Sequence, residues 1–130
     1  AEYDYYTTTK GVLEKVKAHV GDVDFAVQPE LVSLLSSRNF GRYADEKGEM
    51  KVCFISNNDI TGGNSGSAMF NSKGELLGLA FDGNWEAMSS DILYEPKMQR
   101  TIGVDVRYIL FMIEKYGKAG NLIKELNIIN

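Results

Sequence analysis

The chain has 130 residues, enough for one domain with a hydrophobic core, and its 44% apolar and 25% charged residues are ordinary for a globular protein. A net charge of −4 without any run of Lys or Arg argues against nucleic-acid binding. No stretch of about 18 apolar residues is present, so no membrane span is predicted.

Cysteine and histidine are each represented once, by Cys53 and His19. One cysteine excludes an internal disulfide, and one Cys with one His cannot complete a four-ligand zinc site. We therefore predict neither a metal nor another cofactor. The chain begins at Ala1 without a signal-like segment, which favours a processed product or an excised piece.

The first half of the chain is predicted to contain two strands and one helix. Residues 1–22 are polar and mixed, and their few apolar positions fit either a short helix or an extended arm. Residues 23–27 alternate in the manner of a short strand. Pro29 suits the first turn of a helix, and residues 50–55 are apolar enough for a largely buried strand.

A hairpin is predicted next, because the turn-forming residues 71–75 (NSKGE) separate two apolar runs. The returning strand covers residues 76–81. Residues 84–100 then form a long irregular connection, and loops of this length are uncommon unless they are functional.

The C-terminal part is predicted to contain a strand at residues 101–104 and then a helix. Asp105 suits the N-cap of this helix, and the residues after it keep helical apolar spacing. Gly117 is expected to end the helix, and residues 122–126 to add another turn or two.

The segment most informative about function is residues 61–67, which read TGGNSGS between two apolar runs. Glycines let the backbone adopt conformations that a side chain forbids, so such a loop can present one hydroxyl and aim nearby N–H groups at the same point. A serine nucleophile with an oxyanion hole has this architecture. Chymotrypsin-like peptidases carry Gly-Asp-Ser-Gly-Gly here. The alternative, a plain turn between strands, is common for such clusters.

Longer strings carry a specific resemblance. Residues 57–67 (NNDITGGNSGS), 78–86 (GLAFDGNWE) and 99–102 (QRTI) resemble the bacterial serine dipeptidyl-peptidase family that includes the dipeptidyl-peptidase 7 and 11 types. The match is continuous from about Phe40 to the final helix. Ala68 departs from the family pattern, which has proline there; this should alter loop stiffness more than chemistry.

The resemblance implies a mainly β fold, the second-barrel part of a chymotrypsin-like double β-barrel with a C-terminal α-helix. Residues 1–130 would be the C-terminal part of the peptidase catalytic domain. Within it, residues 1–22 would be an arm of uncertain structure, 23–104 barrel strands and loops, and 105–130 the helical segment. The N-terminal barrel and a helical domain of the same protein would be its partners. The family also implies a periplasmic or cell-surface location and a possible homodimer.

For catalysis, the resemblance implies that Ser65 is the nucleophile and that the backbone N–H groups of Gly63 and Ser65 form the oxyanion hole. A serine hydroxyl needs a neighbouring base. His19 lies far earlier in a polar stretch and is interpreted as a surface residue. The catalytic His and Asp would then come from earlier parts of the full-length enzyme, and the isolated chain would be inactive.

For substrates, the resemblance implies peptides from which dipeptides are released. Gly83 would line the pocket for the residue before the cut, where relatives with arginine favour acidic residues, because a guanidinium pairs with a carboxylate. Glycine at this position favours an apolar or aromatic residue, as in the dipeptidyl-peptidase 7 type. Asp82 is the candidate acceptor for the free α-amino group of the substrate, although an exposed strand-end aspartate is an equal alternative.

Two other functions stay open from the residues. Asp59 lies six positions before Ser65, where trypsin-like endopeptidases place the aspartate that binds Lys or Arg side chains. A non-catalytic binding module, in which the serine loop is only a turn, is the second alternative. Asn64 stands where animal serine peptidases have an aspartate that pairs with a new N-terminus. Because an amide carries no charge, zymogen activation of that kind is not expected.

Overall fold

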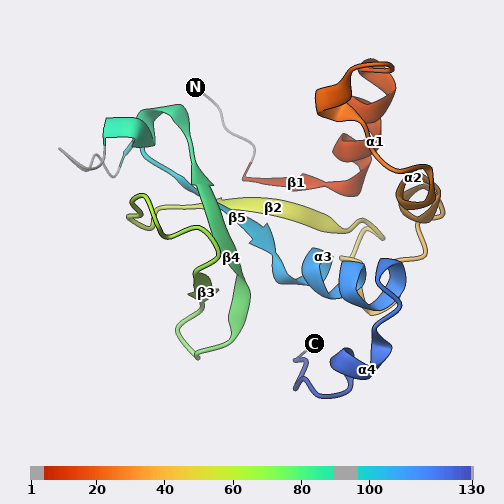
Figure 1. The fold of residues 1–130 in the computed structure, drawn as a ribbon. Coiled ribbons are helices and arrows are strands. Elements are labelled where there is room, and N and C mark those ends of the chain that lie inside the picture. The colour runs from red at the N-terminus through yellow and green to blue at the C-terminus, as the bar shows by residue number, and fades with distance from the viewer. Residues whose placement is uncertain (1–4, 90–96, 130) are drawn as a thin grey trace. The chain divides into compact units, whose positions relative to one another are not determined.

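The computed structural model describes residues 5–89 and 97–129 (Figure 1). The described residues form two compact units. One unit is drawn from Ala1–Tyr6 and Cys53–Val106, and the other from Thr7–Val52 and Arg107–Asn130. The expected division of the chain into an arm (residues 1–22), barrel strands and loops (23–104) and a helical segment (105–130) stays a prediction.

The strands form one five-stranded sheet in the order β1-β2-β5-β4-β3 (Figure 1). Their bounds are β1 Tyr6–Thr8, β2 Lys51–Ser56, β3 Ala68–Phe70, β4 Leu76–Gly83 and β5 Thr101–Asp105. Strand β5 pairs antiparallel with both β2 and β4, and β4 pairs antiparallel with β3. The strands predicted at residues 50–55, 76–81 and 101–104 are confirmed, and so is a β-rich fold that ends in a helix.

The predicted hairpin turn joins β3 to β4 and is organised by Asn71. The Oδ1 atom of Asn71 accepts hydrogen bonds from the N–H groups of Lys73 and Glu75, at 2.9 and 3.0 Å. The carbonyl oxygen of Asn71 accepts a third bond, from Gly74, whose φ of +79° favours glycine. Side-chain bonds from Asn to the following backbone are the usual reason that Asn begins turns.

Two glycines let β4 and β5 pack closely beneath the ring of Phe54. A Cβ atom on Gly78 would lie 2.1 Å from the Val104 carbonyl oxygen and 2.8 Å from the Phe54 ring. A Cβ atom on Gly103 would lie 2.9 Å from the same ring and 2.7 Å from the Met69 sulfur. Any larger residue at Gly78 would therefore move the β4 backbone, to which the serine loop is attached.

The second unit contains most of the helices. These are α1 Thr9–Ala18, α2 Pro29–Ser36 and α4 Gly120–Ile123, while α3 Val106–Phe111 begins in the first unit and continues into a π-helical turn at Met112–Tyr116. The helix predicted from Pro29 is confirmed, with Pro29 in its first turn. Residues 9–18 resolve the open choice for the N-terminal segment in favour of a helix. In the described part of the chain, no helix is both long and apolar enough to cross a membrane.

The strand predicted at residues 23–27 is wrong. Val23–Phe25 forms a 3-10 turn, because the Oδ1 atom of Asp22 accepts a hydrogen bond from the Asp24 N–H at 3.0 Å and caps it. Val23 is 86% exposed, so the alternation of apolar residues here does not mark a buried face. A side-chain cap outcompetes strand pairing in such a short segment.

Aromatic rings form the core of the second unit. The Phe111 ring meets Phe40 and Tyr43 edge to face, with centroid distances of 5.7 and 6.2 Å. All three side chains are almost fully buried. The Tyr43 hydroxyl donates a 2.6 Å hydrogen bond to Oε2 of Glu114, so the one polar atom of this cluster is satisfied.

Candidate active site at the Ser65 loop

The Ser65 loop consists of two consecutive β-turns that share Asn64. The Asn64 N–H donates to the Thr61 carbonyl at 3.1 Å and closes the first turn, and the Ser67 N–H donates to the Asn64 carbonyl at 2.9 Å and closes the second. Gly63 and Gly66 occupy the third position of these turns, with φ values of +99° and +88°. A type II turn requires positive φ at this position, which explains both glycines.

The side chain of Asn64 braces the first turn. Its Oδ1 atom accepts a hydrogen bond from the Thr61 N–H at 2.8 Å. Together with the backbone bond between the same two residues, this contact joins both ends of the turn. Asn64 therefore acts as a turn-forming residue in this loop.

The second turn is fixed to strand β4. The Gly66 N–H donates to the Ala80 carbonyl at 2.7 Å, and the Ala80 N–H donates to the Ser67 carbonyl at 2.9 Å. Ala80 is 3% exposed, so the anchor lies in the interior of the first unit. The loop thus sits on a strand whose own position is set by Gly78 and Gly103.

Ser65 lies at the tip of the second turn and is exposed. Its hydroxyl lies 3.4 Å from the Phe81 carbonyl oxygen, at the long limit of a hydrogen bond, and is available to a reacting group. Within residues 5–89 and 97–129, the amide N–H groups of Gly63 and Ser65 donate to no protein acceptor. Their role as an oxyanion hole stays a prediction, with two donors available for it.

Gly83 closes β4, opposite Thr101 of β5, and is half-buried. A Cβ atom on Gly83 would lie 2.9 Å from the Cβ atom of Ala87 and 3.7 Å from the Arg100 carbonyl oxygen. A side chain at this position would therefore have to displace the short 3-10 helix Trp85–Ser89 slightly. Neighbouring Asp82 is exposed, and its Oδ1 atom accepts a 2.8 Å bond from the Gly83 N–H. The substrate-binding roles of both residues stay predictions.

Asn84 clamps the end of β4 to the segment that leads into β5. Its Oδ1 atom accepts from the Arg100 N–H at 2.9 Å, its Nδ2 donates to the Met98 carbonyl at 2.8 Å, and its backbone N–H donates to the Arg100 carbonyl at 2.9 Å. Because Asn84 directly follows Gly83, these three hydrogen bonds of Asn84 also hold Gly83 in place. The only sequence signal for this clamp is an Asn directly after a strand-ending Gly. The long connection predicted at residues 84–100 lies partly outside the described residues, since residues 90–96 are not described.

Asp59 is exposed in the segment before the serine loop. The adjacent Asn58 carbonyl accepts a 2.6 Å bond from the Thr101 hydroxyl, which is buried in β5. This bond ties the start of the segment to the sheet, close in sequence to Asp59.

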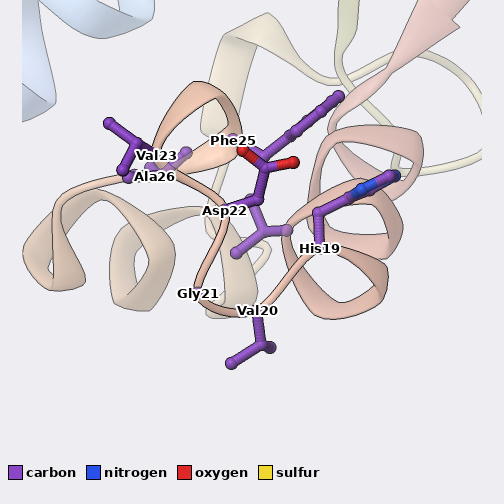
Figure 2. A pocket seen from close by; sticks show the side chains of 9 residues that line it. His19, Val20, Gly21, Asp22, Val23, Phe25 and Ala26 are labelled. Atoms are coloured by element: carbon purple, nitrogen blue, oxygen red, sulfur yellow. The ribbon is translucent and has the colours of Figure 1, made fainter.

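His19 belongs to the second unit and is exposed, as predicted for a surface residue. Its ring stacks on Phe25, with 4.0 Å between centroids and 13° between planes. The two rings line an open pocket of about 310 Å³ with several valines, which Figure 2 shows from close by. Apolar contact explains the place of His19 in its own unit. No cluster of three or more His, Cys, Asp or Glu side chains that could hold a metal occurs in the described residues.

Comparison with known proteins gives a consistent result. The model of the family described as Peptidase S46 matches residues 1–128. A dipeptidyl-peptidase 7 of Porphyromonas endodontalis is 60% identical over 99% of this chain and 15% of its own length, and one of Porphyromonas gingivalis is 57% identical over 99% and 18%. An Asp/Glu-specific dipeptidyl-peptidase of Capnocytophaga gingivalis is 47% identical over 98% and 18%.

The fold has a close counterpart among solved structures. The crystal structure of Porphyromonas endodontalis DPP11 with the dipeptide Arg-Asp superposes with a TM-score of 0.90 at 42% identity, covering 96% of this chain and 18% of that one. The chain therefore spans less than a fifth of the length of these relatives. The resemblance to the dipeptidyl-peptidase family is confirmed.

Proposed function

Because the chain belongs to peptidase family S46, we propose that it carries the nucleophile of a serine dipeptidyl peptidase. The observation that supports this most directly is the loop itself. Ser65 is exposed at the tip of a turn, and among the described residues the N–H groups of Gly63 and Ser65 donate to no protein acceptor. In the proposed reaction, the Ser65 hydroxyl attacks the carbonyl carbon of the second residue of a peptide. The N–H groups of Gly63 and Ser65 stabilise the oxyanion.

The general base would come from the rest of the longer protein. The relatives are about five to seven times as long as the part that this chain matches, and a serine hydroxyl needs a base that accepts its proton. In the complete enzyme, that base takes the Ser65 proton and then donates it to the leaving amine. Water hydrolyses the resulting acyl-enzyme and releases a dipeptide. The sheet of this chain would form the second of two chymotrypsin-like barrels.

We propose an apolar or aromatic preference for the residue before the cut. Gly83 places no side chain at the end of β4, so this position contributes no charge to the proposed pocket for the substrate side chain. The relatives named dipeptidyl-peptidase 7 are 50–60% identical to this chain, and those named Asp/Glu-specific are 41–47% identical. Since both kinds occur among the relatives, the preference rests on Gly83 and on this difference in identity.

The proposal is tested with the full-length protein that contains this chain. Fluorogenic dipeptidyl substrates measure kcat/KM, and a fluorophosphonate probe measures covalent labelling of the nucleophile. Ser65→Ala should abolish both, whereas Ser67→Ala, two positions away in the same loop, should keep labelling. Turnover by a folded Ser65→Ala variant would contradict the assignment of the nucleophile. Cleavage within blocked peptides, but not at free N-termini, would favour an endopeptidase that uses Asp59.

A further inference from the structure

Asn64 is bonded through three of its atoms to the loop that carries Ser65. Its N–H and Oδ1 both bond Thr61, at 3.1 and 2.8 Å, and its carbonyl accepts the Ser67 N–H at 2.9 Å. We propose that Asn64 is a positioning residue: its carboxamide holds the Gly63 and Ser65 amides toward the reacting carbonyl oxygen, and its neutrality keeps negative charge away from the oxyanion. This inference rests on the proposed peptidase function.

The position of Gly63 explains why the Asn64 bond matters. The Gly63 N–H belongs to the peptide unit at the centre of the first turn, and the orientation of this unit distinguishes type I from type II turns. The φ of +99° at Gly63 shows the type II arrangement. The Oδ1 bond to the Thr61 N–H closes the start of the turn, so it restricts rotation of the central unit. The backbone N–H of Ser65 directly follows Asn64 in the chain, so Asn64 influences the orientation of both the Gly63 and the Ser65 N–H groups.

The need for an acceptor of the Thr61 N–H bond does not by itself explain why residue 64 is an amide. An aspartate could accept the same bond from the Thr61 N–H with nearly the same shape. A carboxylate, however, would bring a full negative charge into the loop whose amides stabilise an oxyanion. Like charges in one loop repel each other, and the repulsion grows when a bound substrate excludes water from the site. Substitution of Asn64 by Asp therefore separates the effect of a negative charge on activity from the effect of losing the hydrogen bond to Thr61.

The test uses the full-length enzyme with Asn64→Asp, Asn64→Ala and the control Asn127→Asp, which adds the same charge at an exposed position of the second unit. Measurements are kcat and KM with a dipeptidyl substrate, and the inhibition constant of a dipeptidyl boronic acid. In the boronic acid adduct, the Ser65 Oγ–boron bond forms, the base takes the hydroxyl proton, and the tetrahedral boron carries the negative charge.

We expect Asn64→Ala to lower kcat about tenfold, with KM changed less than about twofold, because a hydrogen bond of ordinary strength is lost. Asn64→Asp should lower kcat about 100-fold and weaken boronic acid binding by a similar factor, again with little change in KM. Asn127→Asp should match the wild type in all three measurements. If Asn64→Ala does not fold, Asn64→Ser, which keeps a short acceptor, replaces it with the same expected direction.

Three results would overturn the inference. Wild-type kcat in Asn64→Ala would remove the positioning role, and wild-type kcat in Asn64→Asp would remove the role of charge. An equal change in KM and in boronic acid binding would show general loosening of the loop rather than effects on the oxyanion. Failure of the proposed function is distinguishable, since then the wild type itself would lack dipeptide release or Ser65→Ala would retain it.

Discussion

Gly66 donates its main-chain N–H to the carbonyl oxygen of Ala80 across 2.7 Å, and this bond attaches the turn that carries Ser65 to strand β4. The amide of Gly66 is thereby occupied, whereas those of Gly63 and Ser65 remain available to a ligand within the described part of the chain. In the proposed site, one loop thus uses the Gly66 amide as an anchor and the Gly63 and Ser65 amides for the oxyanion. Disturbing the backbone of the loop should therefore affect activity more than stability.

Gly63→Ala should lower kcat by a factor on the order of 100, because realignment of the Gly63 N–H costs about as much as removing an oxyanion donor. The cause is conformational, since a φ of +99° disfavours a side chain, while among the described residues only the chain neighbours of Gly63 lie within 4 Å of the added Cβ. The free energy of unfolding should fall by about 1–2 kcal/mol. Activity assays of the full-length enzyme and urea denaturation measure the two effects.

Gly62→Ala is the matched control for this prediction. Gly62 is the neighbouring glycine, its surroundings are equally open, and its φ lies outside the left-handed region. An alanine there should leave activity close to wild type and raise the free energy of unfolding by up to about 1 kcal/mol, because it restricts the unfolded chain. Equal losses in both variants would show that crowding of the cleft, not the φ of Gly63, decides activity.

Tyr43→Phe should lower the free energy of unfolding by about 1–2 kcal/mol near neutral pH, because it removes the hydrogen bond to the Glu114 carboxylate but keeps the ring. Burial, together with the bond and the charge of Glu114, raises the pKa of Tyr43 to about 12. A raised pKa stabilises the fold below the ordinary tyrosine pKa of about 10, and this contribution is lost as pH rises from about 10 to 12.

The same hydrogen bond also predicts a loss of stability at acidic pH. The hydrogen bond from Tyr43 holds the pKa of Glu114 below its usual range. A lowered pKa contributes stability above the unfolded-state value of about 4, and the contribution is lost as pH falls below it. The difference between wild type and Tyr43→Phe should therefore be constant from about pH 5 to 10 and shrink on both sides. Tyr5→Phe, at a residue that is 78% exposed, should show no such difference. A difference that persists unchanged at pH 12 would contradict the Tyr43 assignment.

The sequence predicted those parts of the molecule where one local signal decides the structure. Pro29 began a helix and Asn71 organised a hairpin as expected, since proline geometry and Asn side-chain bonds act over a few residues. The strand predicted at residues 23–27 was wrong because two valines and a phenylalanine gave the apolar alternation of a strand, whereas the side-chain cap from Asp22 determines the backbone conformation.

In the candidate site, too, the sequence predicted only the features that local signals decide. Ser65 is proposed as the nucleophile from the glycines near it, and the positive φ values of Gly63 and Gly66 are local properties. The Asn84 clamp to Met98 and Arg100 could not be predicted, because it joins residues at least 14 positions apart. Likewise, no sequence pattern indicates that the Ala87 Cβ atom lies beside Gly83.

The isolated 130-residue chain should not hydrolyse dipeptidyl substrates. The one histidine, His19, stacks on Phe25 in its own unit, and Ser65 needs a base to act as a nucleophile. Removing the base from such a site leaves only residual catalysis from binding and the oxyanion hole. A substrate assay on the purified chain, with the full-length enzyme as positive control, measures this. Clear turnover that Ser65→Ala abolishes would show that the chain already contains its base.

Gly83→Arg in the full-length enzyme should shift preference from apolar toward acidic residues before the cut. A side chain at position 83 would enter the proposed substrate pocket, where its length excludes large apolar groups and its guanidinium pairs with a carboxylate. The measurement is the ratio of kcat/KM for dipeptidyl substrates ending in Leu and in Asp. We expect this ratio to fall by at least a factor of about 100, since unpaired charges in a pocket are penalised more than a missing apolar contact.

Two further variants separate charge from bulk at position 83. Gly83→Met has a similar length without charge, so it should reduce turnover of the Leu substrate without improving that of the Asp substrate. Both replacements bring a Cβ atom within 2.9 Å of the Ala87 Cβ atom, and Ala87→Gly removes that contact. The double variant Gly83→Arg with Ala87→Gly should therefore show the same preference as Gly83→Arg with better stability. An unchanged Leu to Asp ratio in a folded, active double variant would place residue 83 outside the pocket and remove the main reason for proposing an apolar preference.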